Sequence, residues 1–159
     1  MLKPLLLSEV AQALEARVVG ADVAFTAVST DSRKIEAGQL FIALVGPNFD
    51  GHDYLADVAA KGAVAALVQR EVPGAALPQL VVDDTRIALG QLGALNRAAF
   101  NKPLAAVTGS SGKTTVKEML ASILRAGLNG PVLATRGNLN NDLGAPLTLS
   151  LIHISEPTR

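Results

Sequence analysis

The segment at residues 104–119 reads LAAVTGSSGKTTVKEM and carries the clearest structural signal in the chain. Its first four residues are apolar and predict a buried strand, and the next five are small and polar and predict a tight loop. Helical spacing follows over residues 113–126, with Val116, Leu120 and Ile123 on the inner face. The segment therefore predicts a strand–loop–helix unit of the kind that binds phosphate.

The loop supplies the groups that a nucleoside triphosphate needs. Its glycines let the backbone curl so that N–H groups point at an anion, and the helix N-terminus adds partial positive charge. Lys113 would bind the β- and γ-phosphates and is the candidate catalytic residue, while the Thr114 hydroxyl would be a ligand of Mg²⁺. The loop is the short form Gly-x-x-Gly-Lys-Thr, because Val107 stands where the longer form has glycine. The candidate residues for binding the phosphates of the nucleotide are Gly109, Ser110, Ser111, Gly112, Lys113, Thr114 and Thr115.

Short apolar runs alternate with segments of helical spacing along the rest of the chain. We expect strands at residues 17–19, 23–28, 40–45, 63–68, 80–82, 104–107 and 132–135, and further helices at 8–14, 53–61 and 84–99. Ser8 and Asp84 have side chains suited to capping the first and last of these helices. The alternation predicts an α/β fold with a parallel sheet. We place a small α/β domain at 1–83 and the beginning of a P-loop-type parallel-sheet ATPase domain at 84–149.

The composition excludes several classes of protein. Fourteen basic and fourteen acidic residues give no net charge, so nothing drives contact with nucleic acid or a membrane surface. The chain has no cysteine and only two histidines, which rules out disulfides, iron–sulfur clusters and histidine-rich metal sites. It also lacks a signal peptide and a long apolar run. We expect a soluble cytoplasmic protein.

Together with the loop, two further segments resemble the Mur ligase family. Residues 137–148 (GNLNNDLGAPLT) are similar to an asparagine-rich motif of that family. Residues 29–33 (STDSR) and 38–44 (GQLFIAL) are similar to its uridine-nucleotide-binding first domain. Over residues 1–149 the chain most resembles the members that add D-alanyl-D-alanine to UDP-N-acetylmuramoyl-tripeptide.

This resemblance implies an ATP- and Mg²⁺-dependent ligase of peptidoglycan precursor synthesis that proceeds through an acyl phosphate. Its partners would be UDP-N-acetylmuramoyl-tripeptide and D-alanyl-D-alanine, and the full-length form is expected to be a monomer. Arg33 suits a diphosphate because its planar guanidinium can bond two oxygens. The implied substrate residues are Asp31, Ser32 and Arg33 for the uridine diphosphate and Asn138, Asn140 and Asn141 for substrate or phosphate.

Other interpretations stay open. Another Mur-type ligase or a folylpolyglutamate-type ligase would share the short loop, and a non-catalytic nucleotide-binding module would need only the binding residues. The asparagines are also typical of turns, and residues 31–33 also suit a solvated loop with an ion pair. Asp83 and Asp84 are adjacent carboxylates, but a helix cap explains Asp84 without any acid–base role.

The end of the chain departs from the family pattern. Residues 150–159 resemble translated vector or adapter sequence, so we exclude them, including His153, from the fold. The second carboxylate for Mg²⁺ and the domain that binds the amine substrate would lie beyond this chain. We therefore expect a fragment that is inactive alone and self-associates through an incomplete second sheet.

Overall fold

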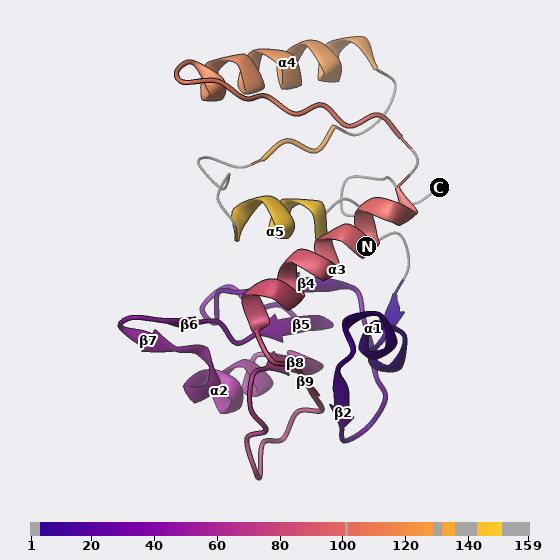
Figure 1. The fold of residues 1–159 in the computed structure, drawn as a ribbon, viewed down its shortest axis with the longest axis vertical. Helices are drawn as coiled ribbons and strands as arrows, with labels where there is room; N and C mark the ends of the chain where they lie inside the picture. The colour runs from indigo at the N-terminus through magenta and orange to yellow at the C-terminus, as the bar shows by residue number, and fades with distance from the viewer. Residues whose placement is uncertain (1–3, 101, 129–131, 136–142, 151–159) are drawn as a thin grey trace.

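The centre of the fold is a five-stranded sheet with the strand order β2-β9-β8-β5-β4 (Figure 1). The computed structural model describes residues 4–100, 102–128, 132–135 and 143–150. The sheet strands are β2 (Arg17–Val19), β4 (Ala27–Ser29), β5 (Gln39–Ile42), β8 (Ala65–Val68) and β9 (Gln79–Val81). All neighbours are parallel except β2 and β9. The short antiparallel ladders pair β1 (Leu5–Leu6) with β3 (Ala24–Phe25) and β6 (Val45–Gly46) with β7 (Phe49–Asp50).

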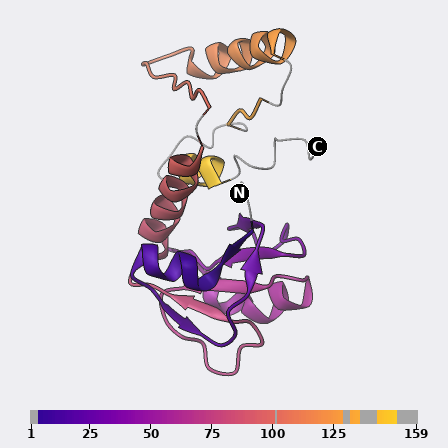
Figure 2. The same cartoon turned by 90° about the vertical axis from the view of Figure 1, so that its right-hand side faces the viewer.

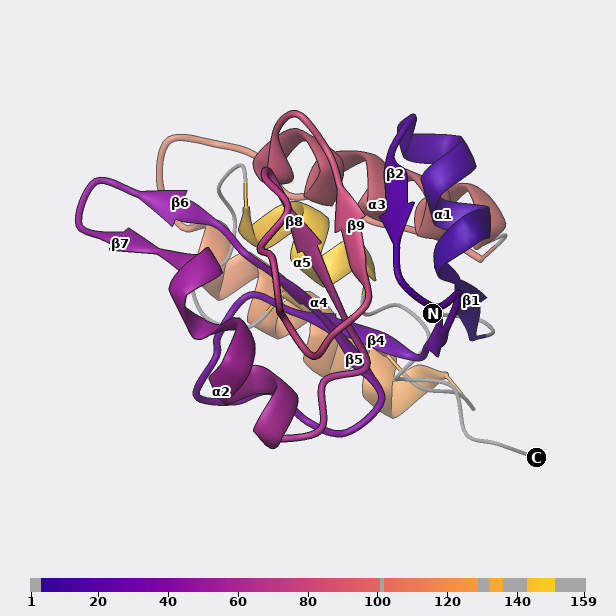
Figure 3. The ribbon, with the colours of Figure 1, turned by 90° about the horizontal axis from the view of Figure 1, so that it is seen from below.

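Helices cover both faces of this sheet (Figures 1 and 3). The helices are α1 (Leu7–Leu14), α2 (Leu55–Ala60), α3 (Thr85–Ala99), α4 (Lys113–Gly127) and α5 (Gly144–Ser150), and the 3₁₀ helix η1 (Gly51–Tyr54) precedes α2. Side chains of α1 and α3 join the core on one face, and those of α2 join it on the other. In the described part of the chain, no helix combines the length and apolar character needed to cross a membrane.

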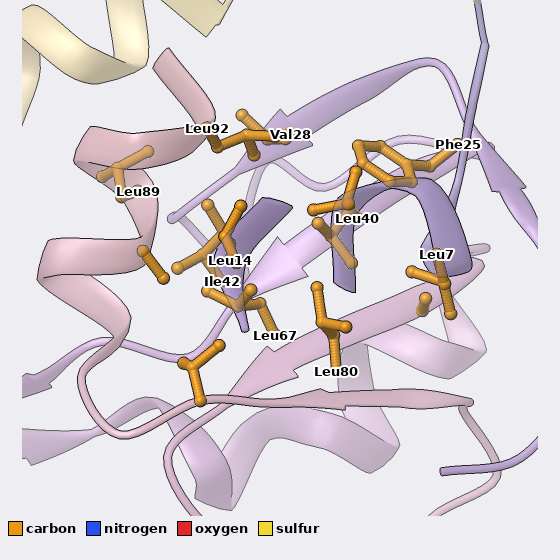
Figure 4. Packing of buried hydrophobic residues seen from close by; sticks show 14 of the residues in the cluster. Leu7, Leu14, Phe25, Val28, Leu40, Ile42, Leu67, Leu80, Leu89 and Leu92 are labelled. Carbon is orange, nitrogen blue, oxygen red and sulfur yellow. The ribbon is translucent and has the colours of Figure 1, made fainter. Parts of the chain in front are cut away.

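Alternation along the central strands sorts the core into two clusters. In β5, Leu40 and Ile42 pack with α1 and α3 (Figure 4), whereas Phe41 packs with α2 on the opposite face. In β8, Leu67 belongs to the first cluster and Val68 to the second. All four residues of β8 are buried because both faces of the sheet are covered. The α/β fold with a parallel sheet that the sequence predicts is confirmed.

One of the two predicted helix caps is confirmed. The Asp84 carboxylate accepts hydrogen bonds from the backbone N–H groups of Arg86 and Ile87, at 2.7 and 3.1 Å. The cap assigned to Ser8 is wrong, because α1 begins one residue earlier and Ser8 lies inside it. Asp22 takes that role, and its carboxylate accepts from both the backbone N–H and the hydroxyl of Ser8, at 2.9 and 2.6 Å.

Two predicted strands are shorter in the structure than in the sequence pattern. The run 23–28 divides at Thr26, so that β3 pairs with β1 while β4 joins the main sheet. The run 40–45 ends as β5 at Ile42, and Val45 starts the β6–β7 hairpin. Apolar runs do not show where a strand changes its partner, so the pattern joined segments that belong to different ladders.

The strand predicted at 104–107 is wrong, and so is the one at 132–135. Both stretches lie outside any ladder of the described residues, and residues 104–106 are exposed. The helix after the loop is confirmed as α4, but Val116 and Ile123 on its expected inner face are 50% and 65% exposed. Figures 1 and 2 show α4 apart from the five-stranded sheet. Burial of these residues requires a sheet against them, and the described chain supplies none there.

The last described segment of the chain packs back against the domain that contains the five-stranded sheet. Helix α5, which the sequence patterns did not reveal, lies along α3, and Leu143 and Leu147 pack against the first core cluster. The contact is close at Gly93, where an added Cβ would lie 3.0 Å from the carbonyl oxygen of Pro146. Ala88, Leu89 and Leu92 of α3 are buried in that same cluster. The boundary expected at 83–84 stays a prediction, although α3 itself packs on the sheet that precedes it.

Candidate functional site

A pocket of about 590 Å³ opens at the carboxyl ends of β4 and β5. Its wall is formed by residues 30–33 after β4, by Phe41 and Leu44 at the end of β5, and by β7 and η1. Small-molecule sites of proteins commonly have volumes of about 300–1,000 Å³, and in parallel α/β sheets they lie at this end of the strands. The pocket thus brings together Asp31, Ser32 and Arg33, the three predicted uridine-nucleotide residues.

The Asp31 carboxylate organises the loop that carries these residues. It accepts from the backbone N–H of Arg33 at 3.0 Å, and from Nε and Nη2 of the same guanidinium at 2.8 and 2.9 Å. The Arg33 side chain lowers the pKa of Asp31 to about 2, with help from the Arg33 backbone N–H. Lys61, directly after α2, holds the loop by donating to the carbonyl oxygen of Ser32 at 3.0 Å, and it also donates to Asp57 of that helix at 2.7 Å.

Arg33 retains donors for an anion while it is paired with Asp31. Its side chain is 83% exposed, and the described residues include no acceptor for Nη1. A guanidinium has five N–H donors in one plane, and the two bonds to Asp31 leave the outer ones for a phosphate. The pair therefore shapes the loop, and the guanidinium still presents N–H donors at the pocket.

Sequence reasoning missed the aromatic side of the pocket. Phe49 of β7 and Tyr54 of η1 line it and are 53% and 44% exposed. A signal was present, since Phe41, Phe49 and Tyr54 lie within fourteen residues of a chain with four phenylalanines, one tyrosine and no tryptophan. Their gathering around one pocket depends on the hairpin and could not be taken from spacing alone.

Asp50 and His52, next in sequence to the pocket residues Phe49 and Gly51, form a hydrogen-bonded cluster. Asp50 accepts from the backbone N–H and Nδ1 of His52, at 2.9 and 2.5 Å, and from Arg70 at 2.7 Å. The other imidazole nitrogen, Nε2, accepts from the backbone N–H of Gln69 at 2.9 Å, so the ring proton lies on Nδ1. His52 is buried, with both nitrogens engaged, and it supports the start of η1. It is not placed to act as a base.

This cluster predicts a dependence of stability on pH. The Arg70 side chain and the His52 backbone N–H hold the pKa of Asp50 well below its usual value of 3.8. On acidification, the unfolded chain therefore takes up a proton that the folded protein does not. The stabilisation from Asp50 is complete above that usual value and is lost as the pH falls through it toward the lower folded-state pKa.

We expect the free energy of unfolding of Asp50→Asn to change less than that of the parent protein between about pH 5 and pH 2. Chemical denaturation at several pH values measures this difference. Asp31 contributes equally to both proteins and does not affect the comparison. The same pH dependence in both proteins would show that Asp50 is not the titrating group.

The glycine-rich loop is the second candidate site. Residues 108–112 are exposed, and Gly109 and Gly112 have φ values of 149° and 72°, which non-glycine residues rarely adopt. Gly112 is the N-cap of α4, and no described side chain caps this helix. The first backbone N–H groups of an α-helix have no partner within it, so they are donors for an anion here.

Lys113 lies in the first turn of α4 and folds back over the loop. Its Nζ donates to the carbonyl oxygen of Gly109 and, at 3.4 Å, to that of Ser110. A phosphate above the loop would replace these carbonyl acceptors with charged oxygens, which bind an ammonium more strongly. The geometry therefore suits the triphosphate tail of a nucleotide, as the sequence predicts.

Thr114 is exposed in the first turn of α4, where its hydroxyl could be a metal ligand. The described residues contain no group of three or more histidine, aspartate or glutamate side chains able to hold a metal ion. In phosphate sites Mg²⁺ commonly takes most of its ligands from phosphate oxygens and water. Thr114 thus fits Mg²⁺ as one ligand of an ion that arrives with a nucleotide.

Helix α4 is bonded to the segment that precedes the asparagine-rich motif. Lys117 donates to the carbonyl oxygen of Thr135 at 2.6 Å and pairs with Glu118 at 2.7 Å, and its side chain is 19% exposed. This residue links the ATP-loop helix to the chain leading into the motif. Asn138, Asn140 and Asn141 themselves lie outside the described residues.

Comparison with known proteins shows which family shares these sequences. Residues 24–97 match a family model described as "Mur ligase family, catalytic domain". Residues 107–156 match one described as "Mur ligase middle domain". The second match continues past residue 149, where we expected the resemblance to end.

Individual relatives are similar over most of the chain. The UDP-N-acetylmuramoyl-tripeptide–D-alanyl-D-alanine ligase of Haemophilus influenzae is 50% identical over 144 residues, which are 89% of this chain and 32% of that protein. The crystal structure of MurF from Acinetobacter baumannii has a TM-score of 0.82 and 45% identity, over 93% of this chain and 33% of that one. The MurF ligase from Thermotoga maritima in complex with ADP has a TM-score of 0.66 and 32% identity, over 77% and 28%. The chain spans about a third of the length of the relatives it matches.

Proposed function

The chain belongs to the Mur ligase family, and we propose that it forms part of an ATP-dependent ligase of peptidoglycan synthesis. That ligase would join D-alanyl-D-alanine to UDP-N-acetylmuramoyl-tripeptide, the reaction named for the Haemophilus influenzae relative. The observation that carries the proposal is the glycine-rich loop at the start of α4, with the Lys113 ammonium folded over it. The ADP complex of the Thermotoga maritima relative supports an adenine nucleotide as the ligand.

The proposed reaction consists of two successive displacement steps. A carboxylate oxygen of the tripeptide attacks the γ-phosphorus of ATP and ADP leaves; the amine of D-alanyl-D-alanine then attacks the acyl carbon, losing a proton, and phosphate leaves. Lys113 and the N–H groups at the start of α4 would hold the phosphates and offset the charge on the transferring group. Mg²⁺, held in part by Thr114, would offset further charge on the phosphate oxygens.

The pocket at the ends of β4 and β5 would receive the uridine nucleotide. Asp31 shapes the loop, and Ser32 and Arg33 would bind the diphosphate through hydroxyl and guanidinium donors. Asn138, Asn140 and Asn141 would orient substrate or phosphate. We place the uridine nucleotide on residues 1–83, ATP on residues 84–149 and no role on the last ten residues. The protein would act in the cytoplasm as a monomer, without a nucleic-acid or membrane partner.

Ligand selection tests this function. The folded chain should bind uridine 5′-diphosphate, and it should bind ATP with Mg²⁺ at a second site, so that saturation with one leaves the affinity for the other unchanged. Folic acid should not bind. Isothermal titration calorimetry measures all three, and uptake of folic acid without uridine diphosphate would favour a folylpolyglutamate-type ligase instead.

A further inference from the structure

We propose that the ring of Phe49 is the surface on which the planar base of the nucleotide stacks, and that Gly46 holds that ring in position. The inference rests on the proposed function for the identity of the nucleotide. It adds a specificity-determining contact that the sequence patterns did not reveal.

The first observation is the exposure of the ring. Phe49 lines the pocket and is 53% exposed, whereas Phe25 and Phe41 are almost fully buried. A planar ligand in the pocket would cover this apolar face and remove it from water. Bases stack readily on aromatic side chains because each base has an apolar face.

The second observation is the contact between the ring and Gly46, its partner across the β6–β7 ladder. A Cβ added at Gly46 would lie 2.3 to 2.8 Å from three atoms of the Phe49 ring. The backbone of Gly46 does not have a positive φ, so its conformation is open to other residues. The absence of a side chain at Gly46 therefore leaves the space that the Phe49 ring occupies, directly against the backbone of the neighbouring strand.

The third observation is the chemistry of the other side chains that line the pocket with Phe49. The same pocket contains the exposed Arg33 guanidinium and the second exposed aromatic ring, that of Tyr54. A pocket with a cationic group and apolar ring faces suits a ligand with an anionic part and a flat heteroaromatic part. A nucleoside diphosphate has both, whereas inorganic pyrophosphate has only the first. The hairpin that carries Phe49 projects beside the sheet (Figure 3), with its ring anchored on Gly46 before any ligand arrives.

A tryptophan reporter tests the stacking directly. The chain has no tryptophan, so Phe49→Trp places a single tryptophan at the pocket, and excitation at the long-wavelength edge of its absorption selects its emission over that of Tyr54. Uridine 5′-diphosphate should change its fluorescence in a saturable way, and saturating pyrophosphate should not. Phe49→Ala should raise the dissociation constant for uridine diphosphate about tenfold and leave that for pyrophosphate unchanged. Gly46→Ala should weaken uridine diphosphate binding selectively too, because its Cβ displaces the ring.

Ile87→Ala is the matched control. It removes an apolar side chain that is 63% exposed on α3 and does not line the pocket, so both affinities should stay at the parent values. If the parent chain binds uridine diphosphate and Phe49→Ala binds it equally, the stacking is refuted while the proposed function stands. If the parent chain binds pyrophosphate but not uridine diphosphate, both fail. Should Phe49→Ala not fold, the Phe49→Trp titration decides alone, and an unchanged emission at saturating uridine diphosphate refutes the contact.

Discussion

Replacing Lys113 by alanine should raise the dissociation constant of the chain for ATP with Mg²⁺ by about 10- to 100-fold. The Nζ atom donates to carbonyl oxygens of Gly109 and Ser110, directly at the loop that would receive the phosphates. A hydrogen bond to a charged group contributes about 1.5–3 kcal/mol, and this ammonium would make such bonds to phosphate oxygens. Calorimetric titration of the two proteins measures the loss.

Arg125→Ala is the control for the change in net charge. Arg125 lies in the last turn of the same helix, twelve residues from Lys113 and about 18 Å along the axis, where the phosphates would not reach. Its removal should leave ATP affinity within about twofold of the parent value, because exposed charges at that distance are screened. Equal ATP affinities for Lys113→Ala and the parent chain would mean that the loop does not bind the triphosphate.

Replacing Gly51 by alanine should lower the free energy of unfolding by about 2–4 kcal/mol. An added Cβ would lie 2.7 to 2.8 Å from the backbone of Ala43 and Leu44, at the end of β5. The approach is close because the N–H of Gly51 donates to the carbonyl oxygen of Leu44 at 2.8 Å. Backbone atoms cannot rotate away as a side chain can, so either η1 or the end of β5 must shift.

Gly90→Ala is the matched control for this substitution. An added Cβ at Gly90 meets no atom within 4 Å, and the residue lies within α3. Alanine is favoured over glycine in helices by about 1 kcal/mol, so this variant should be slightly more stable than the parent. Urea denaturation measures both changes. A Gly51→Ala protein as stable as the parent would show that β5 and η1 are farther apart than described.

The sequence predicted those parts of the fold that depend on local pattern and on burial at both faces. Residues 63–68 read as a buried strand and contain β8, and the helix expected after Asp84 is α3 with its cap. Strands that depend on a neighbour could not be predicted in this way. Residues 104–107 have the apolar composition of a buried strand, but a strand forms only where another strand pairs with it.

In the candidate site, too, the residues indicated by local sequence could be predicted, whereas those that depend on tertiary contacts could not. Lys113 was singled out because a lysine at a helix N-terminus is electrostatically disfavoured without an anion, and Arg33 because its segment resembles the uridine-nucleotide-binding domain of the family. An ion pair in a solvated loop also explains Arg33, and the binding roles of both residues stay predictions. Phe49 was missed because its role depends on the absence of a side chain at Gly46, across the hairpin. The partners of His52 were missed for a related reason, since the backbone N–H that donates to its Nε2 belongs to Gln69, 17 residues later in the chain and directly after β8. Such pairings depend on tertiary structure and have no signature in a single sequence.

The central claim is that the loop at residues 109–115 binds the phosphates of an adenine nucleotide. The direct measurement is a calorimetric titration of the folded chain with ATP, in the presence and absence of Mg²⁺, after circular dichroism and a cooperative melt have shown that it is folded. We expect saturable binding of one ATP per chain that requires Mg²⁺ and is much weaker for adenosine. No heat of binding from a folded preparation at millimolar ATP and Mg²⁺ would contradict it.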